Sequence, residues 1–374
     1  MLVAAILAAG APPVAVEGLA AAAAAEGAEV EVVARPLGIH PMKSNITGST
    51  MKNSLQSIWR ITTFGVGSAL LSSLLLLLNL HLPFTSCAEE SRRNFATPEA
   101  AVAALAEAVK THDQGALKAI FGPDVEEVEN PDRIQATNEW IAFSAALEQG
   151  SHLSHESNTN CVLEVGTNSW PFPIPIVKQN GRWLFDTEAG QDELLNRRIG
   201  RNELATLQVM RAYLEAQREY ASRDHDGDQV LEFAQKLNSS PGTHDGLYWE
   251  PGPDGEISPL GPLVAYAQGE GYELASSDDD DEVPGPFHGY YYRILTRQGK
   301  HAPGGKYDYV INGNMIGGFA LIAWPASYGE SGIMTFIVNQ QGRVYQKDLG
   351  SKTAKMVGRI KEYDPDSTWV PSPD

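Results

Sequence analysis

Hydrophobic positions recur at helical spacing in the stretch that begins near residue 95. Thr97-Pro98 suits the start of a helix, with threonine as the N-cap and proline in the first turn, and apolar residues then recur from Ala101 to Val109. A second short helix is predicted over Leu117 to Phe121, where Gly122-Pro123 stops it, and a third over Asn130 to Leu147. Three helices therefore open this part of the chain.

The pattern changes after Gly150 to short apolar runs that are typical of strands. Such runs cover residues 161–165, 173–178 and 182–186, and Asn180-Gly181 between the last two predicts a type I′ hairpin turn. Helices followed by a curling antiparallel sheet give a first domain over residues 95–190. This order of helices and strands is similar to that of the NTF2-like and cystatin-like folds.

A second domain is predicted over residues 191–374. Leu194 to Arg223 is the longest helical pattern, with a broad apolar face and arginines on the opposite side. A short helix over Leu231 to Leu237 is expected to follow it. Strand-like runs come later, at residues 290–295, 307–311, 319–324, 334–338 and 344–348. One long helix and then an antiparallel meander place the chain in the α+β class.

Residues 51–88 have the pattern of an export signal peptide. Lys52 and Arg60 precede a leucine-rich core at residues 70–80, and Ser86-Cys87-Ala88 fits a small-residue cleavage site. Cleavage there would deliver a periplasmic or extracellular protein. The alternatives are an uncleaved membrane anchor and a lipid anchor at Cys87. Residues 1–50 resemble one β-α-β piece of a flavodoxin-like domain, which alone cannot bury its sheet and is interpreted as a start-site artefact or a fusion remnant.

The formal charge of −19 excludes one class of partner. Acidic and basic residues cancel in the first 88 residues, so the excess acid belongs to the rest of the chain. Such a surface repels phosphate groups, and no nucleic-acid partner is expected. The two cysteines, Cys87 and Cys161, are too few for a disulfide framework, and Cys161 is expected to be a buried strand residue.

Several phrases of the sequence resemble a bacterial family of exported proteins, domain-of-unknown-function family 2950. They are Trp170 to Pro175, Arg197 to Glu203, Asp245 to Trp249, His288 to Tyr292 and Thr335 to Asn339. The resemblance covers nearly all of residues 95–370. It implies an exported protein and brings no assigned activity.

A second resemblance concerns the C-terminal part of the chain. A long helix carrying Tyr213 and Tyr220, the phrase Gly246-Leu247, a strand at 289–292 and a late strand pair at 332–345 look like the globular part of type IV pilin-like proteins. The chain lacks the apolar helix half and the prepilin cleavage site directly before residue 202. The resemblance therefore implies shared fold ancestry without polymerisation through a pilin stalk.

One acidic cluster suggests a metal site for Ca²⁺. Its carboxylates alternate along the chain, and hard oxygen ligands of this kind favour calcium. The predicted ligands are Asp224, Asp226, Asp228 and Glu232. The pattern departs from a calcium loop, because Gln229 stands where the turn glycine belongs and Gln235 where the bidentate glutamate belongs. A solvated acidic junction between a helix and a loop is the alternative.

The motifs G-x-S-x-G and H-E-x-x-H and the P-loop do not occur in the sequence, and no catalytic residue is assigned. The sequence therefore favours a non-catalytic binding or assembly module that contacts an envelope protein or a cell-wall component. The expected contact face comprises Tyr290, Tyr291, Tyr292, Trp324 and Tyr328, with buried core aromatics as the alternative.

The competing function is a small periplasmic hydrolase with its site between the two domains. It would need His288, Asp308 and a hydroxyl such as that of Ser331 within hydrogen-bond reach of one another. A cleft that keeps these groups apart would favour the binding module.

Overall fold

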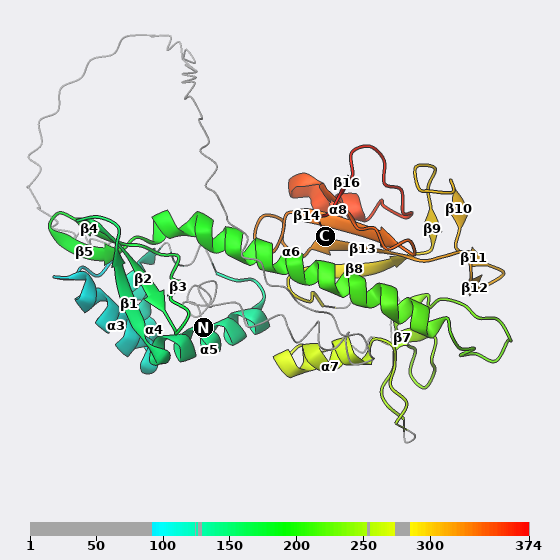
Figure 1. Cartoon of the computed structure of the whole chain (residues 1–374), viewed down its shortest axis with the longest axis horizontal. Coiled ribbons are helices and arrows are strands. Elements are labelled where there is room, and N and C mark those ends of the chain that lie inside the picture. The colour runs from blue at the N-terminus through cyan, green and yellow to red at the C-terminus, as the bar shows by residue number, and fades with distance from the viewer. Residues whose placement is uncertain (1–91, 124, 126–128, 253–254, 274–284, 374) are drawn as a thin grey trace, which may run out of the picture. The chain divides into compact units, whose positions relative to one another are not determined.

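The computed structural model describes residues 92–123, 125, 129–252, 255–273 and 285–373. These residues lie within one of the two compact units into which the chain divides. They form α-helices and several mostly antiparallel sheets (Figure 1), so the predicted α+β class is confirmed. The predicted export signal and the β-α-β piece before it lie outside the described residues.

Three helices begin the described part, as the sequence predicted. Their bounds are α3 Pro98–Lys110, α4 Gln114–Phe121 and α5 Arg133–Gln149. Thr97 caps α3 by accepting a hydrogen bond from the Ala100 N–H at 3.2 Å. Asp132 caps α5 by accepting from the N–H groups of Ile134 and Gln135.

A five-stranded antiparallel sheet follows these helices. Asn180 and Gly181 join its last two strands with φ angles of 51° and 77°, as the predicted type I′ turn requires. The first strand was not predicted, because its sequence Ser-His-Leu-Ser-His holds a single apolar residue. The order is β1-β2-β4-β5, and β3 also pairs with β2. The bounds are β1 Ser151–His155, β2 Asn160–Val165, β3 Trp170–Pro171, β4 Ile176–Gln179 and β5 Arg182–Phe185.

Phenylalanine rings fill the core between these helices and this sheet. Phe121, Phe172 and Phe185 contact one another with ring centroids 5.3 to 6.2 Å apart, and Phe143 lies 5.4 Å from Phe172. Cys161 of β2 is fully buried in the same core, as the sequence predicted.

The long helix α6, Thr187–Tyr220, joins the two halves of the described chain. It begins before Leu194 because Asp186 caps it by accepting a hydrogen bond from the Ala189 N–H. Leu194 packs in the first core, whereas Met210 packs in the second. The predicted domain boundary at residue 191 therefore falls inside a helix that both cores share. None of the described helices has an apolar stretch long enough to cross a membrane.

The second half is built on another five-stranded antiparallel sheet. Its strands follow the order β16-β15-β14-β13-β8. Successive residues of β8 reach opposite faces: the Tyr292 hydroxyl lies 3.3 Å from that of Thr206 in α6, and Arg293 donates to the Val357 carbonyl in α8. The bounds are β8 Tyr290–Leu295, β13 Ala320–Pro325, β14 Met334–Asn339, β15 Tyr345–Asp348, β16 Val370–Pro371 and α8 Thr353–Val357.

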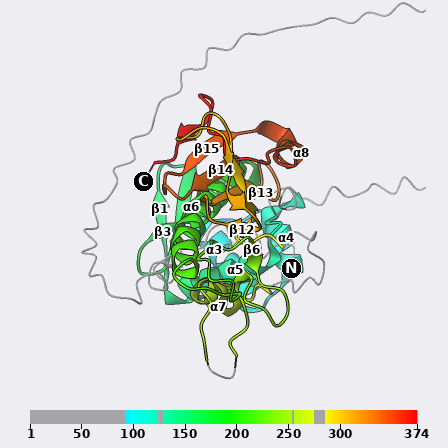
Figure 2. The same cartoon turned by 90° about the vertical axis from the view of Figure 1, so that its right-hand side faces the viewer.

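A further helix, α7 Gly261–Glu270, was not predicted from the sequence. Figure 2 looks along α6 and shows α6 between the C-terminal sheet and α7. The helices α5 and α7 are also in contact. The elements α5, α6, α7 and the sheet therefore surround a common space.

The prediction of a helix over residues 231–237 is wrong. This segment is extended, because Phe233 forms a β-bridge with Met315 and the following residues form β6, Lys236–Asn238. The strand β6 runs parallel to β7, Gly246–Tyr248. Tertiary pairing has therefore overridden an apolar pattern of helical period.

The strand predicted over residues 307–311 is divided into two. β10, Tyr307–Asp308, pairs with β9, Arg297–Gln298, while β11, Val310–Ile311, pairs with β12, Asn314–Met315. Tyr309 lies between them and is fully buried, with its hydroxyl donating to the Gln298 side chain at 3.0 Å. The two short strands can therefore turn to different partners.

Candidate functional site

Polar side chains join α5, α6 and the loop between β13 and β14. Asn202 of α6 accepts a hydrogen bond from the Gln135 side chain and donates one to the Ser331 carbonyl, both at 2.8 Å. Glu203 accepts from the Ile333 N–H at 3.0 Å. These contacts fix the first turn of α5 against the second half of the described chain.

A pocket of about 570 Å³ lies beside this junction, between the start of α5, α6, α7 and the strands β8 and β13. Small-molecule sites in proteins have volumes of about 300–1,000 Å³, so the pocket has the size of such a site. Most of its lining is apolar. The aliphatic residues that contribute to it include Val209, Leu260, Leu263, Val264, Ala267 and Leu321.

Two of the three tyrosines that line the pocket, Tyr213 and Tyr292, have hydroxyl groups engaged with residues outside its lining. Tyr213 donates to the Ala320 carbonyl at 3.1 Å, and the Tyr292 hydroxyl lies 3.3 Å from that of Thr206. Burial raises the pKa of both tyrosines above the usual range, so both are neutral phenols. Their rings therefore extend the apolar wall and add no charge to it.

Charged groups gather at the start of α5 and the end of α7. Tyr272 donates its hydroxyl hydrogen to Asp132 Oδ2 at 2.7 Å, and its ring lies 5.0 Å from that of Phe287. Burial and then the Asp132 charge raise the pKa of the Tyr272 hydroxyl, which keeps it a donor. His288 Nε2 lies 3.0 Å from the Glu270 carboxylate. Asp132, Tyr272 and Phe287 all line the pocket.

The sequence did not predict this pocket, because α7 was not predicted from it. Gly261-Pro262 followed by Leu263, Val264 and Ala267 was the available indication, since proline suits the first turn of a helix. Segments far apart along the chain form the other walls, and their meeting depends on tertiary packing.

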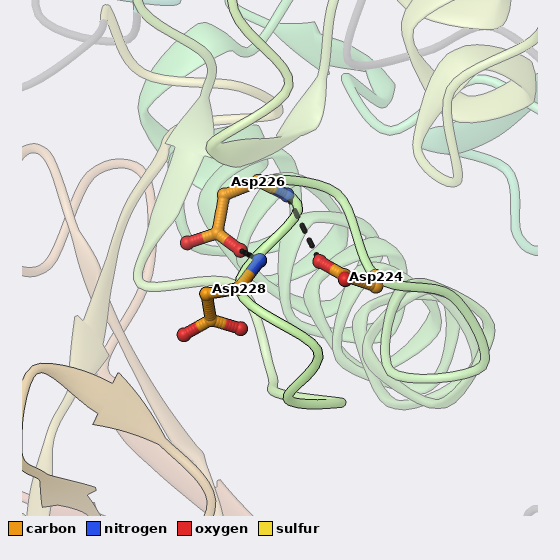
Figure 3. A group of neighbouring side chains, drawn as sticks. All are labelled: Asp224, Asp226 and Asp228. Atoms are coloured by element: carbon orange, nitrogen blue, oxygen red, sulfur yellow. Dashed lines mark hydrogen bonds between the residues drawn. The ribbon is translucent and has the colours of Figure 1, made fainter.

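The predicted metal residues lie on the loop that follows α6, shown in Figure 3. Oxygen atoms of Asp224, Asp226 and Asp228 lie within 4.8 Å of one another, and all three residues are exposed. The N–H groups of Gln229 and Gly227 donate to Asp224 and lower the pKa of its carboxyl group. Gln229 has a φ of 67°, so it adopts the left-handed turn for which a calcium loop uses glycine.

Glu232, the fourth predicted ligand, is not part of this group of three. Its carboxylate accepts a hydrogen bond from the Met315 N–H at 2.9 Å, and Asp228 accepts one from Asn314 at 2.6 Å. Burial raises the pKa of Glu232, and the charges of Asp226 and Asp228 add to this effect. Two of the four predicted ligands therefore also tie the loop to β12.

A second pocket of about 610 Å³ adjoins the aspartate loop. Three of its aromatic residues are engaged in ring stacks: His225 stacks on Tyr220 at 4.1 Å, and His244 stacks on Trp249, outside the lining, at 4.3 Å. Burial lowers the pKa of His225. Most of the other lining residues are charged or polar, so this pocket offers less apolar surface than the first.

The residues of the expected contact face do not lie on one surface. Tyr290 and Trp324 are buried. Tyr290 and Tyr292 point to the α6 face of the sheet, whereas Tyr291 packs against Trp324 on the α8 face. Tyr328 donates its hydroxyl hydrogen to Asp348 at 3.0 Å. The alternative prediction of core aromatics describes Tyr290 and Trp324 better.

The three residues considered for a hydrolase do not all meet. His288 precedes β8 and pairs with Glu270, whereas Asp308 pairs with Arg297 beyond the far end of β8. Ser331 donates its hydroxyl hydrogen to the Ser327 carbonyl. These three residues therefore do not form a triad.

A family model described as a protein of unknown function (DUF2950) matches residues 92–371. This range contains all the phrases that carried the first resemblance. A search of curated proteins and a search of solved structures each gave no match to the chain.

Proposed function

We propose that this chain, which belongs to the DUF2950 family, is a non-catalytic binding protein that takes a small apolar molecule into the pocket between α5, α6, α7 and the C-terminal sheet. The observation that carries the proposal is the pocket itself, with its size and its apolar walls. A formed cavity of this kind is the usual setting for a small ligand.

The chemistry of the walls supports an apolar ligand in particular. The Tyr213 hydroxyl already has a protein partner, and the aliphatic side chains offer no hydrogen bond. Burial of apolar surface contributes about 25 cal/mol per Å², so an apolar body gains most from entering. A polar body placed against these aliphatic walls would lose its hydration without gaining new partners there.

The direct test is binding of N-phenyl-1-naphthylamine, an uncharged apolar dye whose fluorescence rises in apolar surroundings. We expect saturable binding by the chain from residue 89 onward. Leu263→Trp should abolish it, because the larger side chain fills the pocket. Leu204→Trp is the matched control, since Leu204 is 62% exposed on α6 and does not line the pocket. Equal binding by the two variants would refute the pocket as the site.

We further propose that the protein works in the periplasm or outside the cell, with an envelope protein or a cell-wall component as its partner. The support is the leader pattern of residues 51–88. N-terminal sequencing of material from the periplasm should give a mature start near Glu89. A lipid-modified Cys87 or a retained leader would instead indicate membrane anchoring, and full-length cytoplasmic protein would contradict export.

The aspartate loop supports a third proposal, that Asp224, Asp226 and Asp228 hold a calcium ion. Its support is the convergence of three carboxylates together with the turn at Gln229. Calcium at a hundred times its Kd should add about 2.7 kcal/mol to the free energy of unfolding. The melting temperature should therefore be higher in calcium than in a chelator.

A variant pair makes the calcium test specific. Asp226→Asn should reduce the calcium-dependent shift, whereas Asp192→Asn, an exposed carboxylate on α6, should leave it unchanged. Sodium chloride at equal ionic strength controls for general screening. An identical melting temperature with and without calcium would contradict the proposed calcium site.

A further inference from the structure

We propose that the ligand of the apolar pocket carries a positive charge at one end of its apolar body, as a long-chain ammonium compound does. This inference rests on the proposed function and names the class of molecule that the site takes. It follows from the charges and the aromatic rings at the pocket's polar end.

The charge balance of the lining favours a cation. Two carboxylates, Asp132 and Glu273, line the pocket against one guanidinium, Arg133. Asp132 is half-buried, whereas Arg133 and Glu273 are exposed, so the charge nearest the interior is negative. The formal charge of −19 adds a long-range attraction for cations and opposes anions.

The start of α5 would attract an anion if its N–H groups were free. Two of them are not free, because Asp132 Oδ1 accepts from the N–H groups of Ile134 at 3.1 Å and Gln135 at 3.0 Å. A ligand that approaches this helix end therefore meets a carboxylate. An ammonium group suits that position, whereas a carboxylate or phosphate would be repelled.

Aromatic rings beside the carboxylate strengthen the preference. Tyr272 and Phe287 both line the pocket, with centroids 5.0 Å apart and an interplanar angle of 77°. The Tyr272 hydroxyl is fixed to Asp132 Oδ2 at 2.7 Å, so ring and carboxylate stay together. A quaternary ammonium group is attracted by ring faces as well as by the carboxylate. The nearby Glu270 is paired with His288 and is not needed for this balance.

The experiment compares three amphiphiles with the same dodecyl tail, each used below its micelle-forming concentration. They are dodecyltrimethylammonium, the uncharged dodecyldimethylamine N-oxide at pH 8, and laurate. Each competes with N-phenyl-1-naphthylamine for the protein. We expect the ammonium compound to displace the dye at about a tenfold lower concentration than the N-oxide, and laurate to be the weakest.

Asp132→Asn tests the carboxylate while it keeps the helix cap, because asparagine caps a helix as well as aspartate does. This variant should lose the preference for ammonium over N-oxide. The matched control is Asp113→Asn, since Asp113 caps α4 in the same way and does not line the pocket. Arg133→Gln should increase the preference.

The outcomes separate this inference from the proposed function. If the dye binds and the three amphiphiles compete equally, the pocket is a binding site and the inference about charge is wrong. If laurate competes best, the site takes an anion through Arg133 and the inference is overturned. If the dye does not bind to the wild-type chain, the proposed function fails and the inference fails with it.

Discussion

At the scale of single residues, α5 buries a charged side chain and exposes an apolar one. Glu139 is 7% exposed, whereas Ile141 two positions later is 59% exposed. The reason is Arg201 of α6, whose guanidinium lies 2.5 Å from the Glu139 carboxylate. A single sequence contains no information about a partner so distant along the chain, and the buried ion pair could not be predicted.

Arg201→Ala should cost about 3–5 kcal/mol of unfolding free energy, because it leaves a buried carboxylate without its closest counter-charge. Urea unfolding measures the loss. Arg223→Ala is the control: its pair with Glu256 is largely exposed, so the loss should stay below about 1 kcal/mol. Equal losses in the two variants would contradict the role of burial.

The loss in Arg201→Ala should also depend on pH. Burial raises the pKa of Glu139 despite the charges of Arg201 and Arg198. A carboxyl group whose pKa is raised by folding favours the folded state below its unfolded value of 4.5, and this contribution is lost as the pH rises through the folded pKa. The difference between variant and wild type should therefore shrink as the pH falls from 7 toward 4. A constant difference would exclude Glu139 as its source.

At the scale of elements, the periodicity of apolar residues identified the helices and strands that are stabilised by burying a regular apolar face. It predicted α3 to α6 and the long strands β8, β13 and β14, since burial of a regular face stabilises each of them. It failed for residues 231–237, where the backbone takes partners from elsewhere. The buried side chain of Gln217 in α6 accepts from the Ala234 N–H and donates to the Ala234 carbonyl, both at 2.9 Å. A side-chain amide here replaces a neighbouring strand.

Gln217→Leu should therefore destabilise the protein by about 2 kcal/mol or more, because it leaves a buried N–H and a buried carbonyl without partners. Hydrogen exchange at the Ala234 amide should become faster. Gln149→Leu, at the exposed end of α5, should change stability by less than about 0.5 kcal/mol. An unchanged exchange rate at Ala234 would show that other contacts hold this segment.

At the scale of the whole described unit, α6 couples the two cores. The sequence predicts a domain boundary at residue 191, because its pattern changes there from strand to helix. Composition could not show that the helix supplies residues to both cores. The pocket and the polar junction at Asn202 depend on this coupling, so neither could be located from the sequence.

Gly200 lies in the helix α6, after Leu194 and before the part that enters the second core, and a Cβ atom there would meet no neighbour within 4 Å. Gly200→Ala should stabilise the protein by about 0.5–1 kcal/mol, since alanine restricts the unfolded chain. Gly200→Pro should break α6 at a cost of about 3 kcal/mol and divide calorimetric unfolding into two transitions. A single transition in the proline variant would mean that the halves are coupled by other contacts.

Because Cys161 is completely buried, its reactivity can report how often the first half of this unit opens. Once a leader that contains Cys87 is removed, one thiol remains in the chain. A thiol reagent can reach it only when β2 separates from its neighbours, so the rate of labelling counts openings of that sheet alone. The labelling rate of Cys161, measured with and without a ligand in the pocket, would show whether ligand binding also stabilises the first half through α6.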